Sequence, residues 1–170
     1  MTFEVRDTGV GFDAVQATWD LYERAAEASL ERAREAGVRV LVKEALAESG
    51  RCPILFENTA GTQGPLGRDF DELARLVDAA GAGERVGICL DCCHLFASGY
   101  DIVEPEGLAA VLDEYERSVG SDRLKVLHVN DSRVPRGSNR DMHENVGRGE
   151  MGELGISTFL SEPRFEGLPA

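Results

Sequence analysis

Three short apolar runs, separated by stretches with helical periodicity, constrain the fold of this chain most. They are residues 53–57 (PILFE), 85–91 (RVGICLD) and 124–130 (LKVLHVN). Short runs of this kind are typical of parallel strands that are buried on both faces. A further run, Val38–Val42 (VRVLV), has the same character and predicts another strand.

Helical stretches lie between these runs. The residues from Thr18 to Gly37 form an amphipathic pattern, with apolar and small residues at three- and four-residue steps. Further helices are predicted at Asp69–Ala80, at about Glu106–Val119 and at Ile156–Leu160. Alternating strands and helices predict a parallel α/β sheet, either open or curled into a barrel. We find no repeat or linker, so we expect a single domain over 1–170, in which 1–19 is an unassigned N-terminal segment.

One junction in this pattern is unusual. The predicted strand ends at Val42, and Lys43 begins a helical run (KEALAES) with no turn residue between them. Loops from a strand to a helix normally contain two or more residues. The sequence therefore indicates that the chain is shortened at this point.

Length and charge exclude several classes of protein. The 170 residues are enough for about one domain, but a complete barrel of eight strand-helix pairs needs roughly 250 residues. The net charge of −13 argues against broad, non-specific binding to nucleic acid or to anionic membranes. The charged N-terminal residues and the absence of a long apolar run predict a cytoplasmic protein with no membrane span.

The cysteines are too close together for a disulfide framework. Cys89, Cys92 and Cys93 lie within one short segment, and Cys52 is the fourth. Cys89 and Cys92 have the spacing of a zinc knuckle, but no second pair accompanies them. We therefore expect reduced, buried thiols.

Metal-type ligands follow the ends of the predicted strands. Glu57 ends one strand, Asp91 ends the next, and His128 lies at the end of the third. In parallel α/β folds the chemistry takes place at these carboxyl ends. His94 follows Asp91 by one turn, and a later Asp-x-His pair completes the group. The candidate ligands for zinc or manganese are Glu57, Asp91, His94, His128, Asp141 and His143. Taken singly, a carboxylate at a strand end is often a helix cap or a surface charge.

The loop that holds Asp141 and His143 is rich in arginine, glycine and short polar residues. Arg133, Arg136 and Arg140 are candidate contacts for DNA phosphates, because guanidinium groups bind phosphate oxygens. A solvated basic loop fits the same residues.

Several spaced motifs closely resemble the endonuclease IV family, the apurinic/apyrimidinic endonucleases of DNA repair. They are residues 57–61 (ENTAG), 89–94 (CLDCCH), 128–132 (HVNDS) and 141–143 (DMH), the last followed by Gly147 and Gly149. The resemblance extends from about Leu21 to Pro169, with the motifs in the family's order.

The resemblance implies a (β/α)₈ barrel of the TIM type that holds up to three zinc ions, with manganese as an option in one site. It implies that a zinc-activated water cleaves double-stranded DNA on the 5′ side of an abasic site and leaves a 3′-hydroxyl. Glu57, Asp91 and His128 would be catalytic, with Glu57 bridging two ions and the other two residues binding one of them. His94, Asp141 and His143 would bind the third ion, and the family's members act as monomers.

The chain also departs from the family's pattern. Cys92 stands where the family usually has threonine, and Met142 stands where it usually has arginine, so a cation that would face phosphate is lost. Two earlier histidine ligands and a final glutamate ligand are absent. We therefore expect an incomplete barrel of about four to five of the eight units, with open strand edges that favour self-association.

Two other functions remain compatible with these residues. A sugar isomerase or epimerase on a related barrel would use Glu, Asp and His at strand ends to bind its metal ions. Alternatively, the chain is a non-catalytic, metal-binding fragment. The Asp-x-His loop and its arginines favour a phosphate substrate over a sugar.

Overall fold

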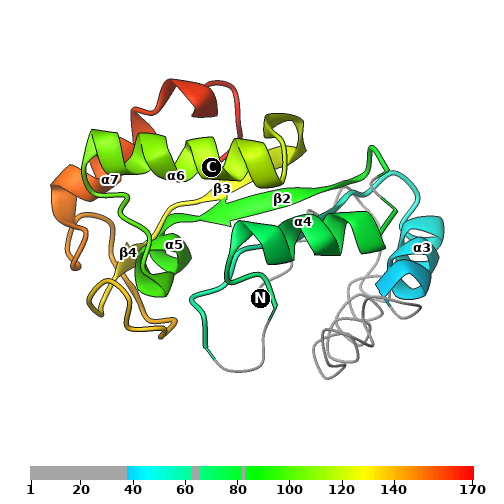
Figure 1. Ribbon diagram of the computed structural model, residues 1–170, viewed down its shortest axis with the longest axis horizontal. Coiled ribbons are helices and arrows are strands. Elements are labelled where there is room, and N and C mark those ends of the chain that lie inside the picture. Colours follow the sequence, from blue (N-terminus) through cyan, green and yellow to red (C-terminus); the bar gives the residue numbers. More distant parts are fainter. Residues whose placement is uncertain (1–37, 63–65, 82) are drawn as a thin grey trace.

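The computed structural model describes residues 38–62, 66–81 and 83–170, and its centre is a parallel sheet (Figure 1). The sheet has the order β1-β2-β3, formed by Ile54–Glu57, Val86–Asp91 and Leu124–His128. Each neighbouring pair is parallel. The three runs that most constrained the fold are therefore strands, and the predicted incomplete barrel is confirmed.

Helices follow the strands in alternation. They are α3 (Val38–Glu48), α4 (Phe70–Ala79), α5 (Cys92–Ser98), α6 (Pro105–Ser118) and α7 (Gly152–Leu160), with short 3₁₀ helices η2 (Ser121–Arg123) and η3 (Pro163–Phe165). A small antiparallel pair, β4 (Asp131–Ser132) and β5 (His143–Glu144), completes the described elements. Sequence patterning located α4, α6 and α7 but not α5 or the β4-β5 pair.

The two faces of the sheet have different roles. Residues at alternate positions, such as Phe56 on β1 and Ile88 on β2, pack into the main core with α4, α6 and α7. The intervening positions Leu55, Cys89 and Val126 form a separate buried cluster, and we call the face that bears them the inner face. Since strand side chains alternate between faces, Glu57, Asp91 and His128 continue this inner face toward the carboxyl ends of the strands.

The prediction of a strand at Val38–Val42 is wrong, because these residues begin α3. Val42 and Ala45 are buried and Leu46 is partly buried against the same core, so a helical spacing of apolar residues continues across the expected junction. Packing of this face against α4 outweighs the strand preference of the valines. Lys43 lies inside one continuous helix, so the expected junction between a strand and a helix does not exist there. The predicted helix at Thr18–Gly37 lies outside the described residues.

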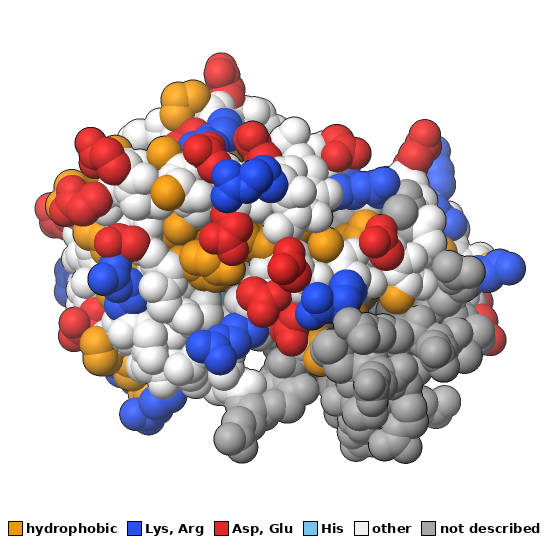
Figure 2. Space-filling model, in the orientation of Figure 1, with side chains coloured by type: hydrophobic (Ala, Val, Ile, Leu, Met, Phe, Trp, Pro, Cys, Tyr) orange, Lys and Arg blue, Asp and Glu red, His pale blue; other side chains and the backbone are white. Residues whose placement is uncertain are grey.

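The face that α4 and α6 present to solvent carries charges of both signs (Figure 2). Acidic and basic side chains alternate across it, with apolar side chains exposed between them. Opposite charges that are interspersed in this way do not create the strong positive field that attracts a phosphate backbone. Among the described helices, none has the length and apolar character needed to cross a membrane.

Candidate metal centre

The parallel sheet brings the predicted strand-end ligands to one rim, at the left of Figure 1 beside α5 and β4. Glu57 on β1 is the register partner of Cys89 on β2, and Asp91 on β2 is the partner of His128 on β3. The three acidic or imidazole groups thus end three neighbouring strands on the same face. This juxtaposition follows from the sheet's register and not from any local motif.

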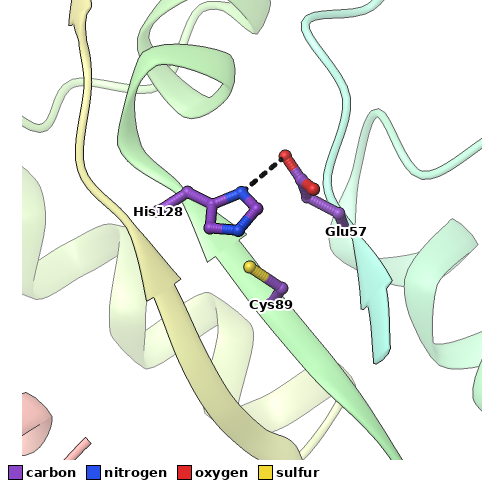
Figure 3. A group of neighbouring side chains, drawn as sticks. All are labelled: Glu57, Cys89 and His128. Carbon is purple, nitrogen blue, oxygen red and sulfur yellow. Dashed lines mark ion pairs between the residues drawn. The ribbon is translucent and has the colours of Figure 1, made fainter. Parts of the chain in front are cut away.

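Glu57 is the buried centre of this rim, with a side chain that is 1% exposed. Its Oε1 lies 3.2 Å from Nδ1 of His128 and 3.2 Å from Nδ1 of His94, and Figure 3 shows the carboxylate turned toward His128. Among the described residues, neither oxygen of Glu57 has a hydrogen-bond donor. A buried carboxylate without donors is costly, so this position favours a bound cation.

The two imidazoles keep Glu57 ionised. Burial by itself would raise the pKa of Glu57, but His128 and His94 outweigh burial and hold its pKa below the ordinary value. An ionised, buried carboxylate between two ring nitrogens is the form that binds a divalent metal.

His94, Asp141 and His143 form a second group of donors at the same rim. Nε2 of His94 lies 3.3 Å from Oδ2 of Asp141 and 3.4 Å from Nε2 of His143. Nε2 of His143 lies 3.1 Å from Oδ1 of Asp141. Three ligand atoms from two distant segments therefore converge within reach of one ion.

The backbone fixes which nitrogen of His94 faces this group. Nδ1 lies 2.8 Å from the carbonyl oxygen of Asn58. A carbonyl only accepts, so Nδ1–H donates, and Nε2 faces Asp141 and His143, where its lone pair can bind a metal ion once the ring is neutral. Metal-binding histidines are typically oriented by such a second hydrogen bond.

The carboxylates around His94 favour a positive charge on this group of residues. Burial disfavours the imidazolium of His94, yet contacts with Asp141 and Glu57, together with the charge of Asp91, raise its pKa to about 10. The same contact with His94 lowers the pKa of Asp141. The cluster therefore holds a proton unless another cation displaces it.

Asp91 is both a structural cap and a candidate ligand. Its Oδ1 accepts from the backbone N–H of His94 at 2.9 Å, which starts α5, and its Oδ2 accepts from Nδ2 of Asn130 at 3.1 Å. The side chain of Asn58 bonds both the N–H (2.7 Å) and the carbonyl (3.0 Å) of Asp91. Complete burial raises the pKa of Asp91. Sequence reasoning missed the two asparagines, although both lie inside the quoted motifs.

A folded loop places Asp141 and His143 against His94. The N–H groups of Gly137 and Asn139 donate to carbonyls at the end of α5, at 3.1 and 2.9 Å. The N–H of Arg133 donates to Met142 at 2.8 Å beside the β4-β5 pair. The loop is therefore attached to the helix that carries His94, which fixes the distance between the two parts of the site.

Buried Asp131 anchors the other end of this loop, and no sequence pattern indicated its role. Its two oxygens accept from four backbone N–H groups, those of Ser132, Gly149, Met151 and Gly152. A Cβ atom at Gly149 would collide with the carbonyl of Ser132 and the carboxylate of Asp131. Only glycine therefore permits the loop to close so tightly around Asp131.

The three arginines proposed to contact DNA are all exposed. Arg133 Nε lies 3.3 Å from Glu144, and Arg136 Nη1 lies 2.5 Å from Asp101, both on the surface. Exposed pairs of this kind are worth little, so the guanidinium groups are available to exchange partners.

The four cysteines are buried, as predicted, and none of them is in a disulfide among the described residues. Cys89 is nonetheless part of the rim. Its Sγ lies within 4.8 Å of ligand atoms of Glu57 and His128 (Figure 3). Burial raises the pKa of this thiol to about 11. The two-residue period of a strand predicts that Cys89 lies on the same face as Asp91, but not that it lies beside Glu57.

The sequence matches a known family over most of its length. A model of the family described as "Xylose isomerase-like TIM barrel" matches residues 41–168. The chain belongs to this family. The description covers barrels with several metal-dependent chemistries, so it does not by itself separate an endonuclease from a sugar isomerase.

Individual relatives show which members of this family the chain is most similar to among those compared. The chain is 43% identical over 133 residues to the probable endonuclease 4 of Carboxydothermus hydrogenoformans, covering 78% of this chain and 45% of that protein. It is 44% identical over 128 residues to the probable endonuclease 4 of Chlorobium limicola, covering 75% and 44%. The crystal structure of endonuclease IV from Thermus thermophilus matches with a TM-score of 0.67 and 37% identity, covering 77% of this chain and 47% of that one. The resemblance to endonuclease IV is therefore confirmed, and the chain spans about half the length of these relatives.

The donors at the rim fit zinc. Imidazole nitrogens and carboxylate oxygens are its usual ligands outside thiolate sites, and the buried oxygens of Glu57 accept no hydrogen bond among the described residues. The described residues offer several overlapping sets of such ligands, among them one around Glu57 and one around His94, Asp141 and His143.

Proposed function

We propose that this chain carries the zinc centre of an endonuclease that cleaves DNA on the 5′ side of abasic sites and leaves a 3′-hydroxyl. The observation that carries the proposal is the convergence of Glu57, Asp91, His94, His128, Asp141 and His143 on one rim. Its relatives named endonuclease 4 favour phosphodiester cleavage over sugar isomerisation. We place this activity in the cytoplasm, where cysteine thiols stay reduced.

Each ligand group has a defined task in this proposal. His94, Asp141 and His143 would hold one zinc ion. Glu57, Asp91 and His128 would hold the zinc beside it, since Nδ1 of His128 lies near a carboxylate oxygen of both Glu57 and Asp91. Zinc held there would supply an activated water and neutralise the charge that develops on the phosphodiester. Asn58 orients His94 and the backbone of Asp91, so the ligands keep their geometry while DNA binds.

DNA would approach over the arginine-containing loop. Arg133, Arg136 and Arg140 lie on the loop between β4 and β5, which also carries Asp141 and leads into His143 at the start of β5. Their guanidinium groups would bind phosphates next to the abasic site and position the strand over the rim. The helical face in Figure 2, with its mixed charges, would point away from DNA.

The test is incision of a 5′-labelled duplex that contains one abasic site, with zinc present. We expect a shortened strand whose end a DNA polymerase extends, which identifies a 3′-hydroxyl. Glu57→Gln and chelation of the metal should abolish the product, and the exposed control Asp78→Asn should retain it. A zinc-loaded protein that leaves the duplex intact would refute the proposal, and turnover of a neutral sugar by that protein would favour the isomerase instead.

A further inference from the structure

A groove lies on the inner face at the amino ends of the strands, which is the end of the sheet opposite to the metal rim. It has a volume of about 350 Å³, and its apolar lining comes from Pro53, Leu55 and Val126. Pro53 directly precedes β1, while Leu55 and Val126 belong to the buried cluster of the inner face. Small-molecule sites typically have volumes of roughly 300–1,000 Å³. The groove is therefore large enough for a small apolar group.

Gly87 on β2 determines where one charged side chain lies in this groove. A Cβ atom at this position would be only 2.6 Å from Cγ of Lys125 and 3.0 Å from a methyl group of Leu55. Because glycine has no Cβ, the aliphatic part of Lys125 can lie across β2 at this point. The ammonium group of Lys125 is thereby held next to the apolar lining.

Two cations line the groove without a carboxylate partner. Nη1 of Arg85 donates to the carbonyl oxygen of Gly50 at 2.6 Å, and Nζ of Lys125 donates to that of Asp122 at 2.6 Å. Among the described residues, neither cation forms an ion pair, although Glu84 also lines the groove. Both side chains have further N–H donors beyond these single bonds. In a chain with a net charge of −13, this pair of cations is a local site for an anion.

We infer that this groove binds a small amphiphilic anion, which has an apolar chain or ring and a single carboxylate group. The apolar part replaces water against Leu55 and Val126, and the carboxylate accepts hydrogen bonds from Arg85 and Lys125. Glu84 repels a second negative charge, so a monocarboxylate is favoured over a dicarboxylate. The inference does not depend on the proposed function, because the groove and the metal ligands lie at opposite ends of the strands.

Octanoate is the probe for the first experiment, which is a calorimetric titration of the full-length chain. We expect one octanoate per chain, and affinity about tenfold lower in Lys125→Gln and in Arg85→Gln, because each variant loses a charged hydrogen-bond donor. Arg117→Gln is the matched control, since it removes the same charge from an exposed position on α6, on the opposite face of the sheet. This control should bind octanoate as the unmodified protein does.

Two further probes test the charge of the ligand on the unmodified protein, so no variant has to fold. Octylammonium has the same chain with the opposite charge and should show no measurable binding, because Arg85 and Lys125 repel it. Octanedioate has a second carboxylate and should bind more weakly than octanoate. Equal affinities for octanoate and octylammonium would overturn the inference, as would full octanoate binding by the double variant Arg85→Gln, Lys125→Gln.

Amide chemical shifts locate the bound octanoate. We expect it to shift the amide resonances of Gly87 and Val126 and to leave those of His94 and His143 unchanged. Shifts confined to the two histidines would assign the carboxylate to the metal rim and overturn the inference. Absence of binding would also overturn it, and a dimer in sedimentation experiments that excludes octanoate would show that a second copy of the chain occupies the groove instead.

Discussion

Two buried carboxylates at the same end of the sheet have opposite surroundings. The oxygens of Asp131 accept from four backbone N–H groups. The oxygens of Glu57, equally buried, have no hydrogen-bond donor among the described residues and face two imidazoles and a thiol. A fully bonded carboxylate stabilises a loop, whereas an unbonded one costs free energy unless a ligand binds it.

The difference separates structural from functional acidic residues. Asp131 closes the loop that positions Asp141 and His143, so its contribution to the site is through the fold. We expect Glu57 to contribute less to the fold, because its oxygens accept no hydrogen bond among the described residues, and to be available to a metal ion. Two acidic residues at or just after strand ends therefore have different roles, one structural and one for metal binding. The sequence alone does not tell these roles apart.

Removing the bonded carboxylate should have the largest effect on stability. Asp131→Ala leaves several buried N–H groups without an acceptor, and we expect a loss on the order of 3 kcal/mol in the free energy of unfolding. Urea denaturation of the metal-free protein measures it. Asp131→Asn keeps one carbonyl acceptor and should lose clearly less. A loss below about 1 kcal/mol for Asp131→Ala would remove the contrast with Glu57.

Removing the unbonded carboxylate should mainly change the response to metal. At a zinc concentration about one hundred times the dissociation constant, a bound ion raises the free energy of unfolding by about 2.7 kcal/mol. Glu57→Gln should lose this increment for the ion at Glu57, because that ion loses a ligand. In metal-free buffer the variant should unfold within about 1 kcal/mol of the unmodified protein. A loss without metal as large as that of Asp131→Ala would contradict a ligand role.

His143 is a candidate metal ligand at the exposed side of the rim, so its role can be tested with little effect on the fold. Its side chain is 44% exposed, so His143→Ala should change metal-free stability by no more than about 0.5 kcal/mol. Because the ion at His94 and Asp141 loses a ligand, zinc content should fall by about one ion per chain. Elemental mass spectrometry measures this number, and an unchanged zinc content would separate His143 from the metal centre.

Glu162 is intermediate between Asp131 and Glu57, because its carboxylate has hydrogen bonds but is partly exposed. Its substitution should have the smallest effect on stability, and this effect should depend on pH. Its side chain is 12% exposed, and its Oε1 accepts from Nε of Arg164 at 2.8 Å and from the N–H of Arg164 at 3.1 Å. Burial would raise the pKa of Glu162, but these bonds outweigh it and lower the pKa. A lowered pKa stabilises the fold above the unfolded value of about 4.3 and loses that stabilisation as pH falls through the folded value.

The unmodified protein should therefore lose stability below about pH 4.5 more steeply than Glu162→Gln, by less than about 1 kcal/mol. Thermal unfolding at a series of pH values compares the two. Parallel pH profiles would show that the contact with Arg164 contributes nothing measurable.

The sequence predicted what depends on strand periodicity and strand ends. Glu57, Asp91 and His128 end apolar runs, and parallel pairing necessarily brings such ends together. Val38–Val42 misled because β-branched residues favour strands locally, while burial of Val42 and Ala45 against α4 decides for a helix. A pattern of neighbouring residues gives no information about α4, because α4 is far from Val38–Val42 in the sequence.

The supporting contacts were harder to predict, because they join segments far apart in the chain. Asn58 bonds Asp91, and Asp131 bonds Gly149 and Gly152, without a periodic or spaced signal. The position of Cys89 beside Glu57 depends on the register between two strands, which sequence patterning leaves open.

The most direct test of the central claim, that this rim is a zinc centre, is the zinc content of the purified chain by elemental mass spectrometry. The account predicts about two ions per chain, one at each set of donors, and a loss of both in the double variant His94→Ala, His128→Ala. A chain without zinc, or a double variant that retains all of it, would contradict the account.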